Sequence, residues 1–124
     1  MNFKLELNIK GDSGFEWSGH AWNHGVWQDG TWHDGEWLGG LWCAGTWEDG
    51  NWSKGVWLGG LWYRGCWHDG TWKNGVWRYG IWEHGIWLSG EWKGGEWSGG
   101  VWQGGKWHSG IWEGGTWLGG QWLN

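Results

Sequence analysis

Six histidines, two cysteines and a series of aspartates are the residues of this chain best suited to chemistry. The histidines are His20, His24, His33, His68, His84 and His108, and the cysteines are Cys43 and Cys66. Imidazole and thiolate groups are common zinc ligands, and carboxylates bind harder cations such as Ca²⁺. Whether any of these groups share an ion depends on the elements that position them.

Other kinds of chemistry have no recognisable pattern in the sequence. Glycine is abundant, but its spacing follows a repeat and not the strand-to-helix turn of a phosphate-binding loop. No nucleophile, acid and base converge, so we expect no enzyme activity and no cofactor. The 124 residues include 13 acidic and 8 basic ones, a net charge of −5. Nucleic-acid binders present clustered Lys and Arg, so we also expect no nucleic-acid partner.

Tryptophan occupies every fifth position from Trp17 to Trp122 and no other position. A short period kept without a slip indicates a repeat architecture in which every unit has the same environment. Because five is odd, a continuous strand would send successive indoles to opposite faces, so each unit must turn a corner. We therefore predict an all-β solenoid whose core is Trp17, Trp22, Trp27, Trp32, Trp37, Trp42, Trp47, Trp52, Trp57, Trp62, Trp67, Trp72, Trp77, Trp82, Trp87, Trp92, Trp97, Trp102, Trp107, Trp112, Trp117 and Trp122.

The other positions of the unit agree with a short strand followed by a tight turn. Val, Ile or Thr often precedes Trp, as strand chemistry favours. Gly, Asp or Asn often stands second after Trp, and we expect the positive φ of the turn there. Each buried indole N–H needs an acceptor. Without acceptors inside, the indoles would face outward as platforms for sugars or bases.

Residues 1–14 differ from the repeat tract of residues 15–124. Phe3, Leu5, Leu7 and Ile9 alternate with polar residues, which predicts one half-buried strand that caps the first coil. This segment has no apolar core of a signal peptide, so we expect a cytoplasmic or virion-associated protein. Two cysteines at unlike places in the repeat indicate free thiols.

The unit Gly-x-Trp-x-x resembles the pentapeptide-repeat family, with Gly at the small inward slot and Trp at the large central one. The glycine recurs from Gly25 to Gly120. A weaker likeness is to membrane-occupation-and-recognition-nexus repeats, whose units are several times longer. The pentapeptide-repeat resemblance covers residues 15–124. It implies a right-handed quadrilateral β-helix with four units per coil, hence about five coils.

A coil of four units predicts which residues stack. His24 and His84 would lie three coils apart and His68 and His108 two apart, so we expect no histidine metal site. One column would hold three turn aspartates, Asp29, Asp49 and Asp69, where stacked carboxylates could attract a cation.

The same stacking predicts an outward apolar column containing Leu41, Leu61, Ile81 and Val101. An exposed apolar patch marks an interface. At the last coil, core aromatics would lack a covering strand. The candidate interface residues are therefore Leu38, Leu41, Leu58, Leu61, Tyr63, Ile81, Val101, Leu118, Trp122 and Leu123.

We therefore expect a non-enzymatic structural or assembly protein, such as a part of a phage or of a surface appendage. Its partner would be another copy of itself, bound end to end or laterally, or a protein docked on the apolar face, with no membrane. The family resemblance also admits an acidic DNA mimic that modulates a type II topoisomerase. The chain has eight basic residues among its acidic ones, so its charge differs from the continuous negative charge of a phosphate backbone.

Overall fold

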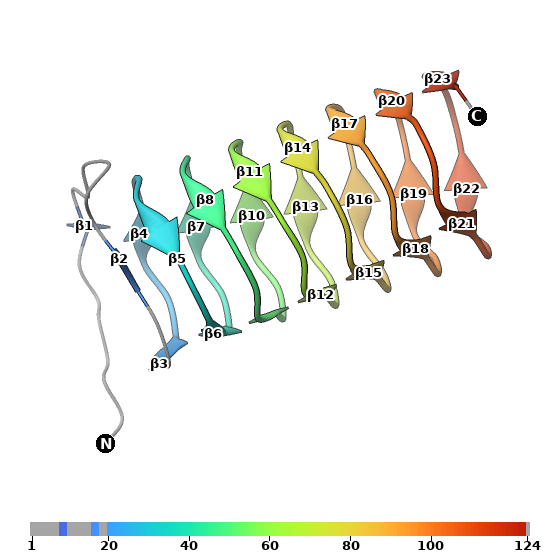
Figure 1. Ribbon diagram of the computed structural model, residues 1–124. Helices are drawn as coiled ribbons and strands as arrows, with labels where there is room; N and C mark the ends of the chain where they lie inside the picture. The colour runs from blue at the N-terminus through green and yellow to red at the C-terminus, as the bar shows by residue number, and fades with distance from the viewer. Residues whose placement is uncertain (1–7, 10–15, 18–19, 124) are drawn as a thin grey trace.

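The computed structural model describes residues 8–9, 16–17 and 20–123, and these form a rod with three flat faces (Figure 1). Each face is one parallel sheet of short strands stacked along the rod axis. Sheet A contains β1 (Asn8–Ile9), β4 (Val26–Trp27), β7 (Leu41–Trp42), β10 (Val56–Trp57), β13 (Thr71–Trp72), β16 (Ile86–Trp87), β19 (Val101–Trp102) and β22 (Thr116–Trp117).

The chain visits the other two sheets before it returns to sheet A. Sheet B contains β2 (Glu16–Trp17), β5 (Thr31–Trp32), β8 (Thr46–Trp47), β11 (Leu61–Trp62), β14 (Val76–Trp77), β17 (Glu91–Trp92), β20 (Lys106–Trp107) and β23 (Gln121–Trp122). Sheet C contains β3 (His20–Trp22), β6 (Gly35–Trp37), β9 (Asn51–Trp52), β12 (Cys66–Trp67), β15 (Ile81–Trp82), β18 (Glu96–Trp97) and β21 (Ile111–Trp112). The described part of the chain contains no helix that could cross a lipid bilayer.

The strand register shows that one coil takes three units of the repeat. Val56 pairs with Thr71, and Trp57 likewise pairs with Trp72, one coil further along the rod. The backbone N–H of Leu61 donates to the carbonyl of Gly45 at 2.9 Å, which ties each coil to the one before it. The predicted β-solenoid is confirmed, whereas the predicted four-sided coil of four units is wrong, and with it the predicted number of coils.

Indole packing across the axis explains the three sides. Successive indoles meet edge to face, with centroids 5.8 Å apart for Trp57 and Trp62 and for Trp62 and Trp67. Indoles one coil apart stack nearly parallel, as do Trp62 and Trp77 at 4.7 Å. Both arrangements are favourable for aromatic quadrupoles. Three indoles therefore fill one cross-section of the rod.

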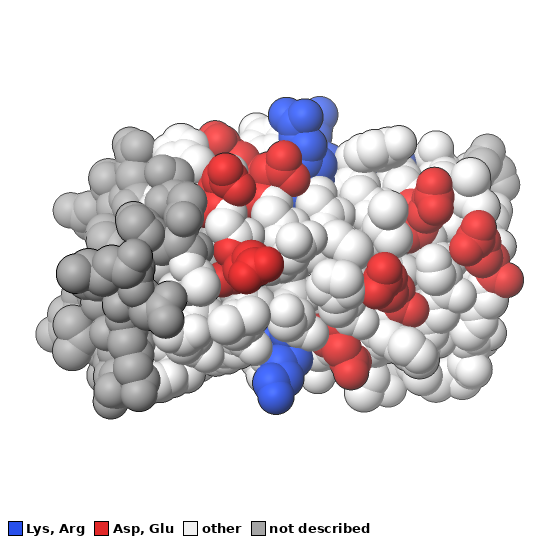
Figure 2. Space-filling view, turned by 90° about the horizontal axis from the view of Figure 1, so that it is seen from below, with Lys and Arg blue, Asp and Glu red and all other residues white. Residues whose placement is uncertain are grey.

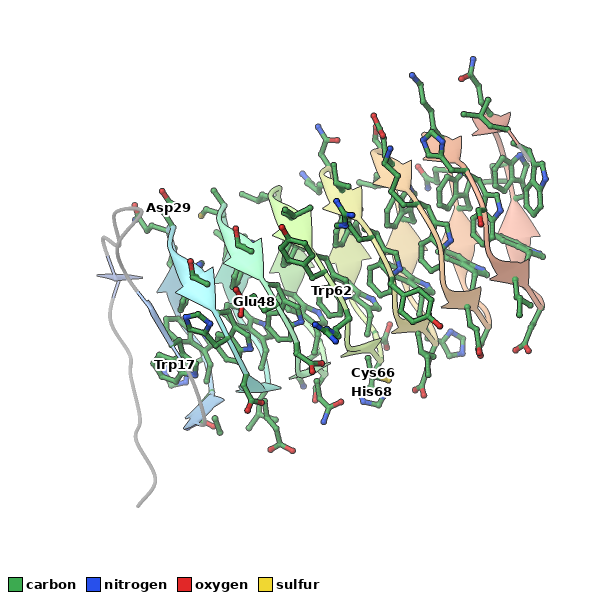
Figure 3. All side chains as sticks on the ribbon, in the orientation of Figure 1. Trp17, Asp29, Glu48, Trp62, Cys66 and His68 are labelled. Carbon is green, nitrogen blue, oxygen red and sulfur yellow. The ribbon has the colours of Figure 1, made fainter. Side chains whose placement is uncertain are left out.

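The indoles lie inside the rod, as Trp17 and Trp62 show in Figure 3. Every Trp from Trp22 to Trp107 is at most 1% exposed. The outward arrangement, with indoles as sugar or base platforms, is therefore wrong. At the last coil Trp112 and Trp117 are partly buried, and Trp122 is 47% exposed.

Glycine forms the corners from Gly25 to Gly120, but one residue later than the sequence suggested. The positive φ expected second after Trp belongs to the next residue, at the multiples of five; Gly60, for example, has φ +119°. A Cβ at Gly60 would stand 2.3 Å from the carbonyl oxygen of Gly45 in the coil below. Left-handed backbone and close contact between coils both require glycine here.

Indole N–H groups point toward the corner of the next coil. Trp42, Trp57 and Trp77 donate to backbone carbonyls there, each at 3.1 Å. At most of the other buried indoles, such as Trp37, Trp52 and Trp62, no acceptor among the described residues meets hydrogen-bond geometry. The expectation of backbone acceptors thus holds for only part of the core.

The first strand is described only at Asn8 and Ile9, which form β1 and pair with Val26 and Trp27 of β4. Phe3, Leu5 and Leu7 lie outside the described residues. The capping role of residues 1–14 therefore stays a prediction.

Candidate functional site

A coil of three units changes which outward side chains are neighbours. In each strand Trp points inward, so the residues on either side of it point outward and form two columns along the face. Cys66 and His68 flank the buried Trp67 in this way. Glu83 stands one coil above His68, because the two residues are three units apart in the sequence.

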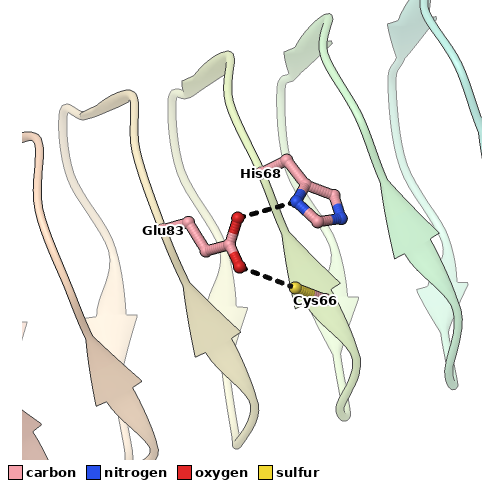
Figure 4. A group of neighbouring side chains, drawn as sticks. All are labelled: Cys66, His68 and Glu83. Carbon is pink, nitrogen blue, oxygen red and sulfur yellow. Dashed lines mark hydrogen bonds and ion pairs between the residues drawn. The ribbon is translucent and has the colours of Figure 1, made fainter.

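Cys66, His68 and Glu83 form a compact cluster on sheet C (Figure 4). The Nδ1 atom of His68 lies 2.7 Å from Oε1 of Glu83. The Sγ atom of Cys66 lies 3.8 Å from Oε2 of the same carboxylate and donates a weak hydrogen bond to it. All three potential ligand atoms lie within 4.8 Å of one another.

The cluster is accessible from solvent. The side chains of His68 and Glu83 are 43% and 47% exposed, and Cys66 is half-buried. Cys66 also lines a shallow hollow at the corner between sheets B and C, together with Asp49, Arg64 and Tyr79. A small ion or molecule can therefore approach the cluster from solvent.

Burial and the Glu83 carboxylate keep the Cys66 thiol protonated. Desolvation, followed by the negative charge of Glu83 and its hydrogen bond, raises the pKa of Cys66 to about 11. Burial also raises the pKa of Cys43. Both cysteines are free, as the sequence indicated.

This pKa predicts slow reaction of Cys66 with a small disulfide reagent. At pH 8 a thiol of pKa about 11 forms roughly 100-fold less thiolate than one of pKa 9, and its higher nucleophilicity offsets part of this loss. We expect Cys66 in the Cys43→Ser variant to react about tenfold more slowly than in the unfolded chain. The rate should continue to rise with pH up to about 11. Equal folded and unfolded rates at pH 8 would contradict the prediction.

A second His–Glu pair repeats half of this cluster on sheet B. Nδ1 of His33 lies 2.7 Å from Oε1 of Glu48, again one coil apart. The residue two before His33 is Thr31, where the first cluster has Cys66. The two pairs therefore differ in whether a thiol stands beside them.

Glu91, Lys93 and His108 make a looser cluster on sheet B. Glu91 lies 3.2 Å from Nζ of Lys93 and 3.4 Å from Nε2 of His108. The hydrogen bond and charge of Lys93 lower the pKa of Glu91. All three side chains are at least partly exposed, which limits such pairs to small energies.

The columns expected from a coil of four units are wrong. Asp29, Asp49 and Asp69 follow strands of sheets A, B and C, so they lie on three different sides of the rod and cannot share a cation. Each accepts a hydrogen bond at 2.8 Å from the next residue's backbone N–H, which confirms their role in turns. His68 and His108 lie on different sheets.

The predicted apolar column is also divided among the faces. Leu61 and Tyr63 belong to sheet B and Leu38 and Ile81 to sheet C, whereas Leu41, Leu58, Val101 and Leu118 belong to sheet A. The physical reason is that four units make one and one-third coils. Trp122 and Leu123 lie at the last coil of sheet B, where Leu123 is 53% exposed.

The coil of three units instead gathers aliphatic side chains on sheet A. We call its two outward columns the aliphatic face. The column before Trp is Val26, Leu41, Val56, Thr71, Ile86, Val101 and Thr116, and the column after Trp is Gln28, Cys43, Leu58, Lys73, Leu88, Gln103 and Leu118. Lys73 is the one charged residue in these columns.

The other two faces carry most of the charge. On sheet B the column after Trp includes Glu48, Arg78 and Lys93, and on sheet C it includes Glu83 and Glu113. In Figure 2, which shows the rod from below, acidic side chains lie at several places along the described part of that side.

The sequence interpretation missed both the cluster and the composition of this face, because each depends on the coil length. One signal was available: His33 and Glu48 have the same separation in the sequence as His68 and Glu83, and that separation is three units.

Searches with protein-family models, against curated proteins and against solved structures found no match to this chain.

Proposed function

We propose that this chain is a non-catalytic structural protein whose rod pairs side by side with a second copy through the aliphatic face. The observation that carries the proposal is the segregation of side chains: one face of the prism is aliphatic and nearly uncharged, and the other two are charged. Several of its residues, including Leu41 and Leu58, are half-buried, and Ile86 and Leu118 are 39% and 64% exposed.

Physical chemistry supports a match between two such faces. Burial of apolar surface is favourable at roughly 25 cal/mol per Å², and a flat β face permits close contact over its length. With strands about 4.8 Å apart, the seven strands from β4 to β22 span roughly 30 Å. Two identical faces related by a twofold axis are self-complementary. The contact area between two faces of this length is below that of a standard interface. Association should therefore be weak and depend on concentration.

A second lysine on the aliphatic face, in addition to the native Lys73 beside β13, should prevent pairing. Leu41→Lys places a charge in the contact, and we expect the variant to remain monomeric at concentrations where the native chain forms dimers. Leu61→Lys is the matched control, since Leu61 precedes Trp in the same way but belongs to sheet B. Sheet B already holds Lys106 at this place in the unit. Sedimentation equilibrium over a wide concentration range measures the effect.

The outcomes distinguish lateral pairing from end-to-end contact. Dimers lost in Leu41→Lys and retained in Leu61→Lys support the aliphatic face. Dimers that survive Leu41→Lys and are lost in Leu123→Lys would place the contact at the last coil, next to Trp122. A native chain that stays monomeric throughout would contradict self-assembly.

The DNA-mimic alternative has no comparable support. A phosphate backbone presents uninterrupted negative charge. On sheet B, in contrast, Glu48 is followed along the same column by Tyr63, Arg78 and Lys93, and Arg78 lies over the Tyr63 ring at 5.4 Å.

A further inference from the structure

We infer that Cys66, His68 and Glu83 form a binding site for Zn²⁺, with one coordination position left for water. A thiolate, an imidazole and a carboxylate are all zinc ligands, and three protein ligands with an open fourth position are a known arrangement for this ion. The site is independent of the lateral pairing proposed above, because it lies on sheet C and not on the aliphatic face.

The backbone holds the three ligands in position. Cys66 and His68 point to the same side because each flanks Trp67, whose indole is fixed in the core and fully buried. Glu83 is brought to them by the pairing of β12 with β15, in which Cys66 is opposite Ile81. The N–H of Glu83 donates to the carbonyl of Trp67 at 2.8 Å, which fixes the carboxylate one coil from the histidine.

The ligand separations suit a tetrahedral ion. Zinc binds sulfur at about 2.3 Å and nitrogen or oxygen at about 2.0 Å, which places ligand atoms about 3.5 Å from one another. The sulfur lies 3.8 Å from Oε2 of Glu83 and the imidazole Nδ1 lies 2.7 Å from Oε1, values on either side of this one, and one ligand atom from each residue lies within 4.8 Å of the others. The exposed side chains of His68 and Glu83 are free to rotate toward an ion held by the sulfur, and solvent reaches the site on their side.

Charge also favours a cation here. Zn²⁺ would replace the hydrogen bond between His68 and Glu83 with direct coordination by the imidazole and the carboxylate. The thiol proton leaves to solvent when the ion binds, so no oxidant or reductant is required.

The test is zinc titration of the reduced, chelator-treated chain by isothermal calorimetry, with Co²⁺ as a spectroscopic substitute. We expect one Zn²⁺ per chain and a thiolate-to-Co²⁺ charge-transfer absorption band. Cys66→Ser should abolish the band and weaken zinc binding at least about tenfold, and Glu83→Gln should also weaken it. Cys43→Ser is the matched control, because it removes the other free thiol and should change neither result.

The chain also permits a gain of function. Thr31→Cys places a thiol beside the His33–Glu48 pair, which already has the same 2.7 Å geometry. We expect this variant to bind two Zn²⁺ per chain. Because this variant gains a second Zn²⁺, the result cannot be explained by a variant that fails to fold. Circular dichroism of each variant verifies the fold.

Two results would overturn the inference. One is a native chain that binds no zinc at millimolar concentration. The other is a charge-transfer band that survives Cys66→Ser or disappears in Cys43→Ser.

Discussion

Replacing Gly60 with alanine should destabilise the rod by about 3 kcal/mol or more, whereas the same change at the adjacent Gly59 should be tolerated. Gly60 has φ +119°, which alanine adopts only with strain, and its new Cβ would stand 2.3 Å from the Gly45 oxygen. Neighbouring coils would have to separate, which would break the hydrogen bond from Leu61 to Gly45.

Gly59 supplies the control within the same pair of glycines. Its φ is not in the left-handed region, and a Cβ there would lie 3.8 Å from its nearest neighbour, the carbonyl oxygen of Cys43. Alanine at such a position is neutral or stabilises by up to about 1 kcal/mol, because it restricts the unfolded chain. Urea unfolding followed by circular dichroism measures both variants. Equal costs at the two positions would show that the corners do not depend on left-handed glycine.

Truncation of a central indole should produce the second large effect. Trp62 is fully buried and stacks on Trp47 below and Trp77 above, each at 4.7 Å. Trp62→Ala removes both stacks and leaves a cavity in the core, where three indoles fill each cross-section of the rod. We expect a loss of about 3 to 5 kcal/mol in the free energy of unfolding.

The same substitution at the last coil should cost less than half as much. Trp122 is 47% exposed and stacks on Trp107 alone. In a solenoid each unit is stabilised mainly by its neighbours, so loss at the end removes fewer contacts. Denaturant unfolding of Trp62→Ala and Trp122→Ala side by side makes the comparison. An equal loss in the free energy of unfolding for both variants would show that stacking between neighbouring coils does not determine the stability of the core.

Within a single unit the sequence predicted the strand, the corner and the inward indole correctly, but it placed the positive φ one residue too early. Because five is odd, only a corner in each unit can keep Trp57, Trp62 and Trp67 on one side, and this followed without knowledge of the coil. The short strands before each corner followed from the Val, Ile and Thr that precede tryptophan. The free thiols of Cys43 and Cys66 also followed, from their unlike places in the repeat.

The candidate metal site could not be predicted, because its members meet only through the coil length. Cys66 and His68 are neighbours in any strand, but Glu83 joins them only if one coil takes three units. With four units per coil, the residue above His68 would have been Leu88. The aliphatic face was missed for the same reason, since its column runs from Val26 to Leu41 and Val56.

The sequence by itself therefore determined a repeating strand-and-corner unit with an inward indole, and the tertiary structure decided how many units close a coil. A period of five fixes the conformation within each unit through local sterics and side-chain alternation. Closure depends instead on contacts across the axis, where three edge-to-face indoles fill the section and stack on the next three. Those stacks join residues three units apart, and they settle which outward side chains become neighbours.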